Sequence, residues 1–246
     1  MKFDPDQITI ERTDKTHFLG TWRHPRDDQF APVWNLTMGA RATAGNYLDS
    51  RDTIANNARL SDPAKAEDTK AAARRALTDL GDSQRDLNEL TAKLNETRLK
   101  LAEIPSAGPE QTLIDLELAR YFRAAPEAER SNLLTAMTEG SAPQLIDALL
   151  RLPGVLFGVT EELRTVIEQN AIARRSPDEV RQAGEMSDAI RTAQAVLSKS
   201  VRIVTEAANL SLQEQMTSLG ADAWQPHVKA GPPDAMEALA ANYGVA

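Results

Sequence analysis

Two long stretches of the chain carry apolar residues at the spacing of a helix. In the first a leucine recurs every seven residues, and in the second the apolar residues follow intervals of three, four and seven. This pattern predicts long helices over residues 63–104 and 177–219, each on the order of 60 Å long at a rise of about 1.5 Å per residue. Gly81 and Gly184 are expected weak points, because glycine costs about 1 kcal/mol relative to alanine within a helix. The predicted packing seam consists of Leu80, Leu87, Leu94, Leu101, Ile190, Leu197, Val201 and Val204.

The leucine stripe of the first long helix has a polar companion row. Gln84, Thr91 and Arg98 occupy the alternate core positions of the same register. A parallel zipper between two chains would therefore be poorly packed. Packing of the two long helices against each other, antiparallel and within one chain, is favoured, and an intermolecular coiled coil is the alternative.

Proline marks where several of the shorter helices begin. Pro109, Pro126 and Pro143 each follow a small residue, and proline suits the first helical turn because its missing N–H would have no partner there. Ser176 and Glu179 have the spacing of a capping box at the start of the second long helix. The shorter helices are predicted over residues 47–60, 109–124, 126–139, 143–152 and 160–175.

The N-terminal segment differs from the remainder of the chain in its aromatic residues and its lack of helical periodicity. Polar and apolar residues alternate over residues 7–12, which predicts a strand or hairpin within an otherwise extended arm. Tryptophan and arginine are enriched at the centres of protein interfaces, so this arm contains the candidate partner-binding residues. Its rings are expected either to cover the chain's own helices or to dock on another molecule. The candidates are Trp22, Arg23, Arg26, Phe30 and Trp34.

These elements predict an all-α fold. The expected architecture is an elongated helical bundle with two long antiparallel, coiled-coil-like helices, shorter capping helices and an extended N-terminal arm. The arm is expected over residues 1–46 and the helical body over 47–219. Residues 220–246 are expected to form a linker followed by a short helix at 235–243.

Charge and composition restrict the classes of partner. The chain has 28 basic and 36 acidic residues and a net charge of -8, which disfavours direct binding to nucleic acid. It has no cysteine, which is compatible with a reducing compartment. The first residues lack the apolar region of a secretory signal, and no apolar run is long enough to span a membrane. We therefore expect an intracellular, cytoplasmic or particle-associated protein with no membrane partner.

Residues suited to catalysis are sparse. Phosphate-binding loops and nucleophile elbows are missing from the sequence, and its histidines are His17, His24 and His227, all outside the predicted helices. His17 and His24 with Asp27 and Asp28 form a candidate metal-binding set, but their spacing matches no closed site. The sequence therefore predicts no catalytic, cofactor-binding or metal-binding residues.

The predicted function is that of a non-catalytic structural or assembly protein. It would hold neighbouring protein subunits through its long helices and N-terminal arm, as a homo-oligomer or within a larger assembly such as a virus particle. The alternative is a helical adaptor or regulatory module that binds a partner protein. A third hypothesis is an enzyme acting through a metal held by the histidine and aspartate set.

Overall fold

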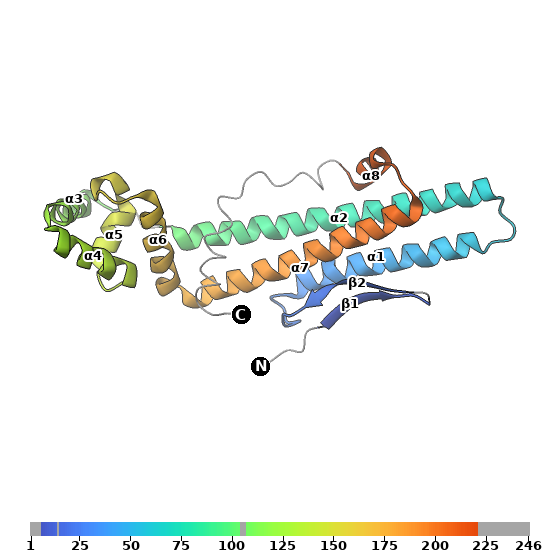
Figure 1. Ribbon diagram of the computed structural model, residues 1–246, viewed down its shortest axis with the longest axis horizontal. Helices are drawn as coiled ribbons and strands as arrows, with labels where there is room; N and C mark the ends of the chain where they lie inside the picture. The colour runs from blue at the N-terminus through green and yellow to red at the C-terminus, as the bar shows by residue number, and fades with distance from the viewer. Residues whose placement is uncertain (1–5, 14, 104–106, 221–246) are drawn as a thin grey trace. The chain divides into compact units, whose positions relative to one another are not determined.

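The computed structural model describes residues 6–13, 15–103 and 107–220, and most of them are helical. Within these residues the chain forms eight α-helices and one two-stranded sheet, which confirms the helical class predicted from the sequence (Figure 1). The described part of the chain divides into two compact units. Unit 1 comprises residues 6–95 and 185–220, and unit 2 comprises residues 96–184.

Unit 1 begins with an antiparallel hairpin made of β1 (Asp6–Glu11) and β2 (Thr16–Trp22). The hairpin confirms the strand predicted from the alternating residues. Ile8, Ile10 and Leu19 are buried, whereas most of the intervening residues remain partly or fully exposed. One face of the hairpin therefore packs against the helices of unit 1, as alternation along a strand requires.

Three helices make up the body of unit 1: α1 (Ala31–Ala55), α2 (Asp62–Ala102) up to residue 95, and α7 (Pro177–Ala208) from residue 185. Helices α1 and α7 run in the direction opposite to α2 (Figure 1). The hairpin contacts both α1 and α7. Arg41 of α1 donates a hydrogen bond to the Thr9 carbonyl oxygen at 2.5 Å, and a Cβ added to Gly20 would lie 3.1 Å from Val196 of α7.

Helix α1 begins at Ala31, so the prediction of a non-helical arm up to residue 46 and a helix from residue 47 is wrong. Pro32 occupies the first turn of α1, where proline is well tolerated, and does not interrupt an extended segment. The buried face of α1 has helical spacing, but half of its residues are alanine or threonine, which weakens its hydrophobic signal. Its buried residues are Val33, Thr37, Ala40, Ala44, Tyr47 and Leu48.

The second long helix ends earlier than predicted. Helix α7 stops at Ala208, and α8 (Leu212–Leu219) follows as a separate helix. Asn209 adopts a left-handed backbone conformation with φ of 50°, which asparagine tolerates better than most residues. Ser211 then begins α8 with a capping box. The predicted weak points Gly81 and Gly184 both lie within continuous helix.

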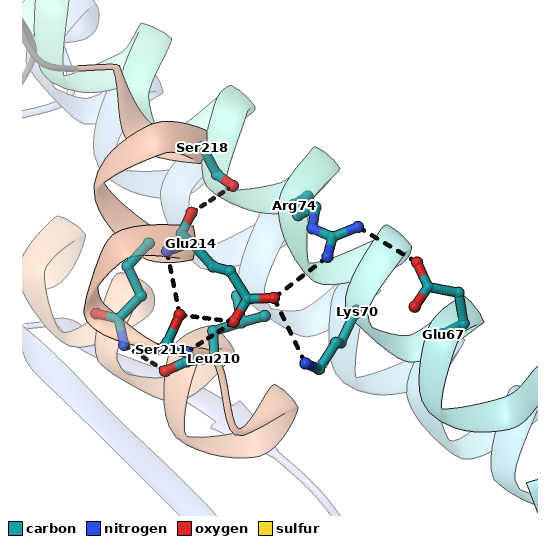
Figure 2. A network of polar contacts seen from close by, with 8 residues as sticks. Glu67, Lys70, Arg74, Leu210, Ser211, Glu214 and Ser218 are labelled. Carbon is teal, nitrogen blue, oxygen red and sulfur yellow. Dashed lines mark hydrogen bonds and ion pairs between the residues drawn. The ribbon is translucent and has the colours of Figure 1, made fainter. Parts of the chain in front are cut away.

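Helix α8 is tied to α2 by a network centred on Glu214 (Figure 2). The Glu214 carboxylate accepts hydrogen bonds from the Ser211 amide at 2.9 Å and the Ser211 hydroxyl at 2.8 Å. It also lies 3.2 Å from the Arg74 guanidinium and 3.4 Å from the Lys70 amine, both on α2. The hydrogen bonds from Ser211, followed by that from Arg74, lower the pKa of Glu214 to about 2.

The C-terminal end of α8 approaches the backbone of α2 closely. The Thr78 hydroxyl donates a hydrogen bond to the Ser218 carbonyl oxygen at 3.2 Å. One turn further along α2, a Cβ added to Gly81 would lie 2.2 Å from the Leu219 carbonyl oxygen, which is closer than two such atoms can approach. Gly81 therefore provides the space in which α8 docks.

Unit 2 is a small helical cluster with its own core. The four α-helices that lie wholly within it begin and end within one residue of the predicted positions. Phe122 and Phe157 are buried in this core with their ring centroids 5.8 Å apart. The elements of unit 2, besides the adjoining ends of α2 and α7, are α3 (Pro109–Ala124), α4 (Glu127–Glu139), α5 (Pro143–Arg151), the 3-10 helix η1 (Gly154–Leu156) and α6 (Glu161–Arg175).

A buried ion pair joins α3 to α5 in unit 2. Asp115 is 1% exposed and accepts two hydrogen bonds from the Arg151 guanidinium, at 2.7 and 2.8 Å. Gln111 donates a further hydrogen bond to Asp115 at 2.9 Å. The bonds from Arg151, followed by that from Gln111, lower the pKa of Asp115, so its charge is compensated inside the unit.

Two other predictions are that no segment spans a membrane and that a short helix lies near the C-terminus. Among the described residues, no helix combines the length and the apolar character that crossing a membrane requires. The short helix predicted over residues 235–243 lies outside the described residues.

The two mid-helix glycines allow a paired test of the contact between α8 and α2. Gly81→Ala is expected to lower the free energy of unfolding by about 1–3 kcal/mol, because the added methyl group displaces α8. Gly184→Ala is the matched control, since apart from its chain neighbours and the backbone of its own helix no described atom lies within 4 Å of the added methyl group, and it should raise stability by about 1 kcal/mol. Chemical denaturation would measure both, and equal stabilisation by the two substitutions would contradict this account of α8.

The charge of Glu214 gives unit 1 a predictable dependence on pH. Because the pKa falls from an ordinary 4.5 to about 2 on folding, the carboxylate stabilises the folded state above pH 4.5. This contribution should disappear as the pH falls from 4.5 through about 2. The wild type should be more stable than Glu214→Gln at pH 7, and denaturation curves should converge towards pH 2. A difference that does not change with pH would show that the charge has no part in docking α8.

Candidate functional site

Four aromatic rings gather where the hairpin leads into α1. The ring centroid of Trp22 lies 5.3 Å from that of His24 and 5.1 Å from that of Trp34. His24 in turn stacks on Phe30 at 5.2 Å. We refer to Trp22, His24, Phe30 and Trp34 as the aromatic cluster. It joins the end of β2, the following loop and the first turn of α1, so rings from three successive segments form one packed group.

The structure separates the predicted partner-binding residues into buried and accessible ones. Trp22 and Phe30 are only 1% and 2% exposed, and they belong to the interior of unit 1. Trp34 is half-buried and lies under the Arg26 guanidinium, whose carbon is 4.4 Å from the ring centroid. Arg23 and Arg26 are exposed. Of the predicted residues, a partner could therefore contact Arg23, Arg26 and the half-buried Trp34, and their role in binding stays a prediction.

His24 is the titratable member of the aromatic cluster. Its Nε2 lies 3.4 Å from a carboxylate oxygen of Asp188 on α7, too far for a strong hydrogen bond. Burial lowers the pKa of His24, and the negative charges of Asp188 and Glu185 oppose that effect only in part. The neutral imidazole is therefore the form that the folded unit prefers.

The residues of the predicted packing seam lie inside the chain. Leu80, Leu87 and Leu94 of α2 are buried, although the polar companion row lowers the apolar character of this face. Ile190, Leu197 and Val204 of α7 are buried as well, whereas Leu101 and Val201 are only partly buried. Within one chain the leucine stripe is thus already covered along most of its length.

Unit 2 exposes large apolar side chains that the sequence reasoning missed. On α3, Ile114 and Tyr121 are 53% and 52% exposed, and Leu118 between them is partly buried against the core. These three residues lie on one flank of the helix because they are four and three residues apart. We refer to them as the α3 stripe. Other exposed apolar residues of unit 2 are Leu99, Leu113, Val155 and Val166.

A signal for this surface was present in the sequence. The core-facing row of α3 consists of Asp115, Ala119 and Phe122, which are all buried. The α3 segment also holds apolar residues beside that row, more than one face of a helix can bury. An excess of this kind indicates a second contact surface, but only the positions of the neighbouring helices show which residues stay uncovered.

Carboxylates lie beside the α3 stripe. The Tyr121 hydroxyl donates a hydrogen bond at 2.7 Å to Glu129 of α4, which raises the pKa of the tyrosine. Glu110 and Glu117 each precede an exposed member of the stripe by one helical turn. Glu117 also accepts a hydrogen bond from Arg120 at 2.6 Å. The stripe therefore has acidic neighbours on α3 and α4.

A small pocket opens where the hairpin turn meets α1 and α7. Its basic side chains are largely compensated: Arg12 forms ion pairs with Asp49 and Asp52, and Arg51 also pairs with Asp52. An anionic ligand would have to compete with these carboxylates. The lining residues are Arg12, Lys15, His17, Leu48, Arg51, Ile203, Glu206 and Ala207.

The candidate metal-binding set is not brought together. His17 lies near the start of β2 and lines the pocket, whereas His24 lies beyond the end of β2 in the aromatic cluster. Asp27 accepts backbone hydrogen bonds from Phe30 and Ala31 before α1. Across the residues that the structure describes, histidine, aspartate and glutamate form no group of three or more suited to a metal ion.

The preference of the folded state for neutral His24 gives a testable pH dependence. Because folding lowers the pKa from 6.5, the unfolded chain binds more protons below that pH, and stability falls as the pH decreases. Between pH 7.5 and 5.5 the wild type should lose more thermal stability than His24→Gln, which cannot titrate. An equal loss in the two proteins, or a gain in the wild type, would contradict the burial of a neutral imidazole.

Comparison of the chain with protein-family models, with curated proteins and with solved structures gives no match. Function is therefore inferred from the surfaces of the molecule. Two surfaces are candidates for contact with other proteins: the α3 stripe with its acidic neighbours in unit 2, and Arg23, Arg26 and Trp34 in unit 1.

Proposed function

We propose that this chain is a non-catalytic structural or assembly protein that holds neighbouring protein subunits. The observation that carries the proposal is the apolar surface of unit 2, above all the α3 stripe. Contiguous exposed apolar side chains commonly mark protein contacts, whereas isolated ones need no explanation. Burial of such side chains against another protein is favourable by about 25 cal/mol for each Å² removed from water.

A second contact surface in this proposal consists of Arg23, Arg26 and Trp34 at the aromatic cluster. Tryptophan and arginine are the residues most enriched at interface centres. The buried ring of Trp22 packs against Trp34 and holds it in place, so little conformational entropy would be lost when a partner binds. The N-terminal segment would thus act as a preformed surface of unit 1.

The long helices supply the supporting framework in this proposal. We infer that α2 and α7 act as an antiparallel, coiled-coil-like pair within unit 1. The supporting observation is that Leu80 and Leu87 of α2 and Leu197 and Val204 of α7 are buried in the same unit. Such a framework would suit a component of a large repetitive assembly, for example a virus particle.

The alternative is a helical adaptor that binds a different protein. The net charge of -8 and the glutamates beside the α3 stripe favour it, because like charges oppose association between copies of the chain. The two functions differ in one measurable property. An assembly protein associates with itself, whereas an adaptor remains a monomer until its partner is added.

The solution mass of the full chain tests this proposal. Light scattering over a range of concentrations should show species larger than a 26.9 kDa monomer. Ile114→Gln combined with Tyr121→Gln should shift the distribution towards the monomer, because it removes the apolar contact of the α3 stripe. Leu212→Gln, at an even more exposed apolar position in unit 1, is the control and should leave the mass unchanged. A wild type that stays monomeric throughout would exclude self-assembly and favour the adaptor.

A further inference from the structure

The α3 stripe is an apolar ridge with negatively charged glutamates beside it. Ile114 and Tyr121 project from the flank of α3, and Leu118 continues the ridge down to the core of unit 2. We infer that this face binds an amphipathic helix of another protein that carries lysine or arginine beside its own apolar residues. The inference rests on the proposed function in that it requires unit 2 to contact protein, and it specifies the chemistry of the partner.

The spacing of charges on α3 supports a helical partner. Glu110 precedes Ile114 by four residues and Glu117 precedes Tyr121 by four residues, so glutamate and apolar side chain alternate along one row of the helix. A partner helix has the same repeat, and its basic side chains can face the glutamates while its apolar face covers the ridge. Glu129 of α4 adds a third carboxylate beside Tyr121.

Carboxylates outnumber the guanidinium groups placed beside the α3 stripe. Arg120 pairs with Glu117 and offsets its charge, whereas Glu110 and Glu129 add two further negative charges next to Ile114 and Tyr121. Arg123 lies on the side of α3 opposite to the stripe, as its spacing along the helix shows. The stripe thus remains acidic overall.

Charge also distinguishes the proposed partner from two other candidates for covering the apolar ridge, a second copy of the chain and the chain's own C-terminal residues. A second copy of this chain has a net charge of -8. Residues 221–246 of the chain itself contain three acidic side chains, Asp222, Asp234 and Glu237, against one lysine. A basic helix is complementary in charge to the acidic α3 stripe, whereas a second copy of the chain and residues 221–246 carry the same sign of charge. Complementary charge selects partners and accelerates their association.

Synthetic peptides provide the test on the full chain. The first probe is a fluorescently labelled 18-residue helix with leucine on one face and lysine on the other, and the second replaces each lysine with glutamate. In roughly 0.15 M salt the leucine–lysine peptide should bind the wild type at least about tenfold more tightly than the leucine–glutamate peptide, measured by fluorescence anisotropy. Equal affinities of the two peptides would overturn the inference.

Variants then place the binding on α3. Glu110→Gln with Glu117→Gln should weaken binding of the leucine–lysine peptide by about five- to tenfold and reduce its salt dependence, because two charge contacts are lost. Ile114→Gln with Tyr121→Gln should abolish binding, whereas Leu212→Gln in unit 1 should not change it. Circular dichroism checks that each variant is folded. Unchanged affinity in both α3 variants would overturn the inference, and so would the absence of hydrogen-exchange protection over residues 110–121 of the wild type on peptide binding.

The results separate this inference from the proposed function. If Ile114→Gln with Tyr121→Gln reduces self-association but no peptide binds, the basic helix is excluded while the apolar contact stands. If the wild type is monomeric and the leucine–lysine peptide binds through α3, the inference is supported and the adaptor is favoured over the assembly protein.

Discussion

Burial of the apolar faces of α1, α2 and α7 is the interaction on which unit 1 depends. Leucines of α2 and leucine, isoleucine and valine residues of α7 are buried in this unit together with small residues of α1, such as Ala40 and Ala44. The hairpin covers one side with Ile8, Ile10 and Leu19. Helix α8 packs against α2 at Gly81, where the missing side chain leaves space for it. Glu214 of α8 also forms ion pairs with α2.

Unit 2 has a different balance between core and surface. Its core is small, and one buried ion pair between Asp115 and Arg151 fixes α3 against α5. Breaking such a pair leaves a buried charge without a partner, so it defines the orientation of α3 strongly. That orientation decides which apolar residues of α3 are covered. Ile114 and Tyr121 remain outside the core, and the acidic residues near them set the kind of partner that the surface can accept.

The two surfaces proposed for binding differ in how they are held. Trp34 packs against the buried ring of Trp22 and Arg26 lies over the ring of Trp34, so packing orients both side chains. The α3 stripe is fixed by a regular helix, and it presents side chains at a repeat that another helix shares. A protein that connects other proteins needs surfaces that are rigid before binding, because ordering them on contact would cost affinity.

The sequence by itself determined the helical class, the hairpin and most helix boundaries, because proline, capping residues and apolar periodicity act over a few neighbouring residues. The capping box at Ser211 was missed, because α7 and α8 were predicted as one helix. Tertiary structure alone decided that Trp22 and Phe30 are buried, that the leucine stripe lies within the chain, and that Ile114 and Tyr121 face solvent. The physical reason is that the exposure of a helix face depends on which helices, distant in sequence, pack over it. Apolar periodicity shows which residues share a face, but it does not show which helix covers that face.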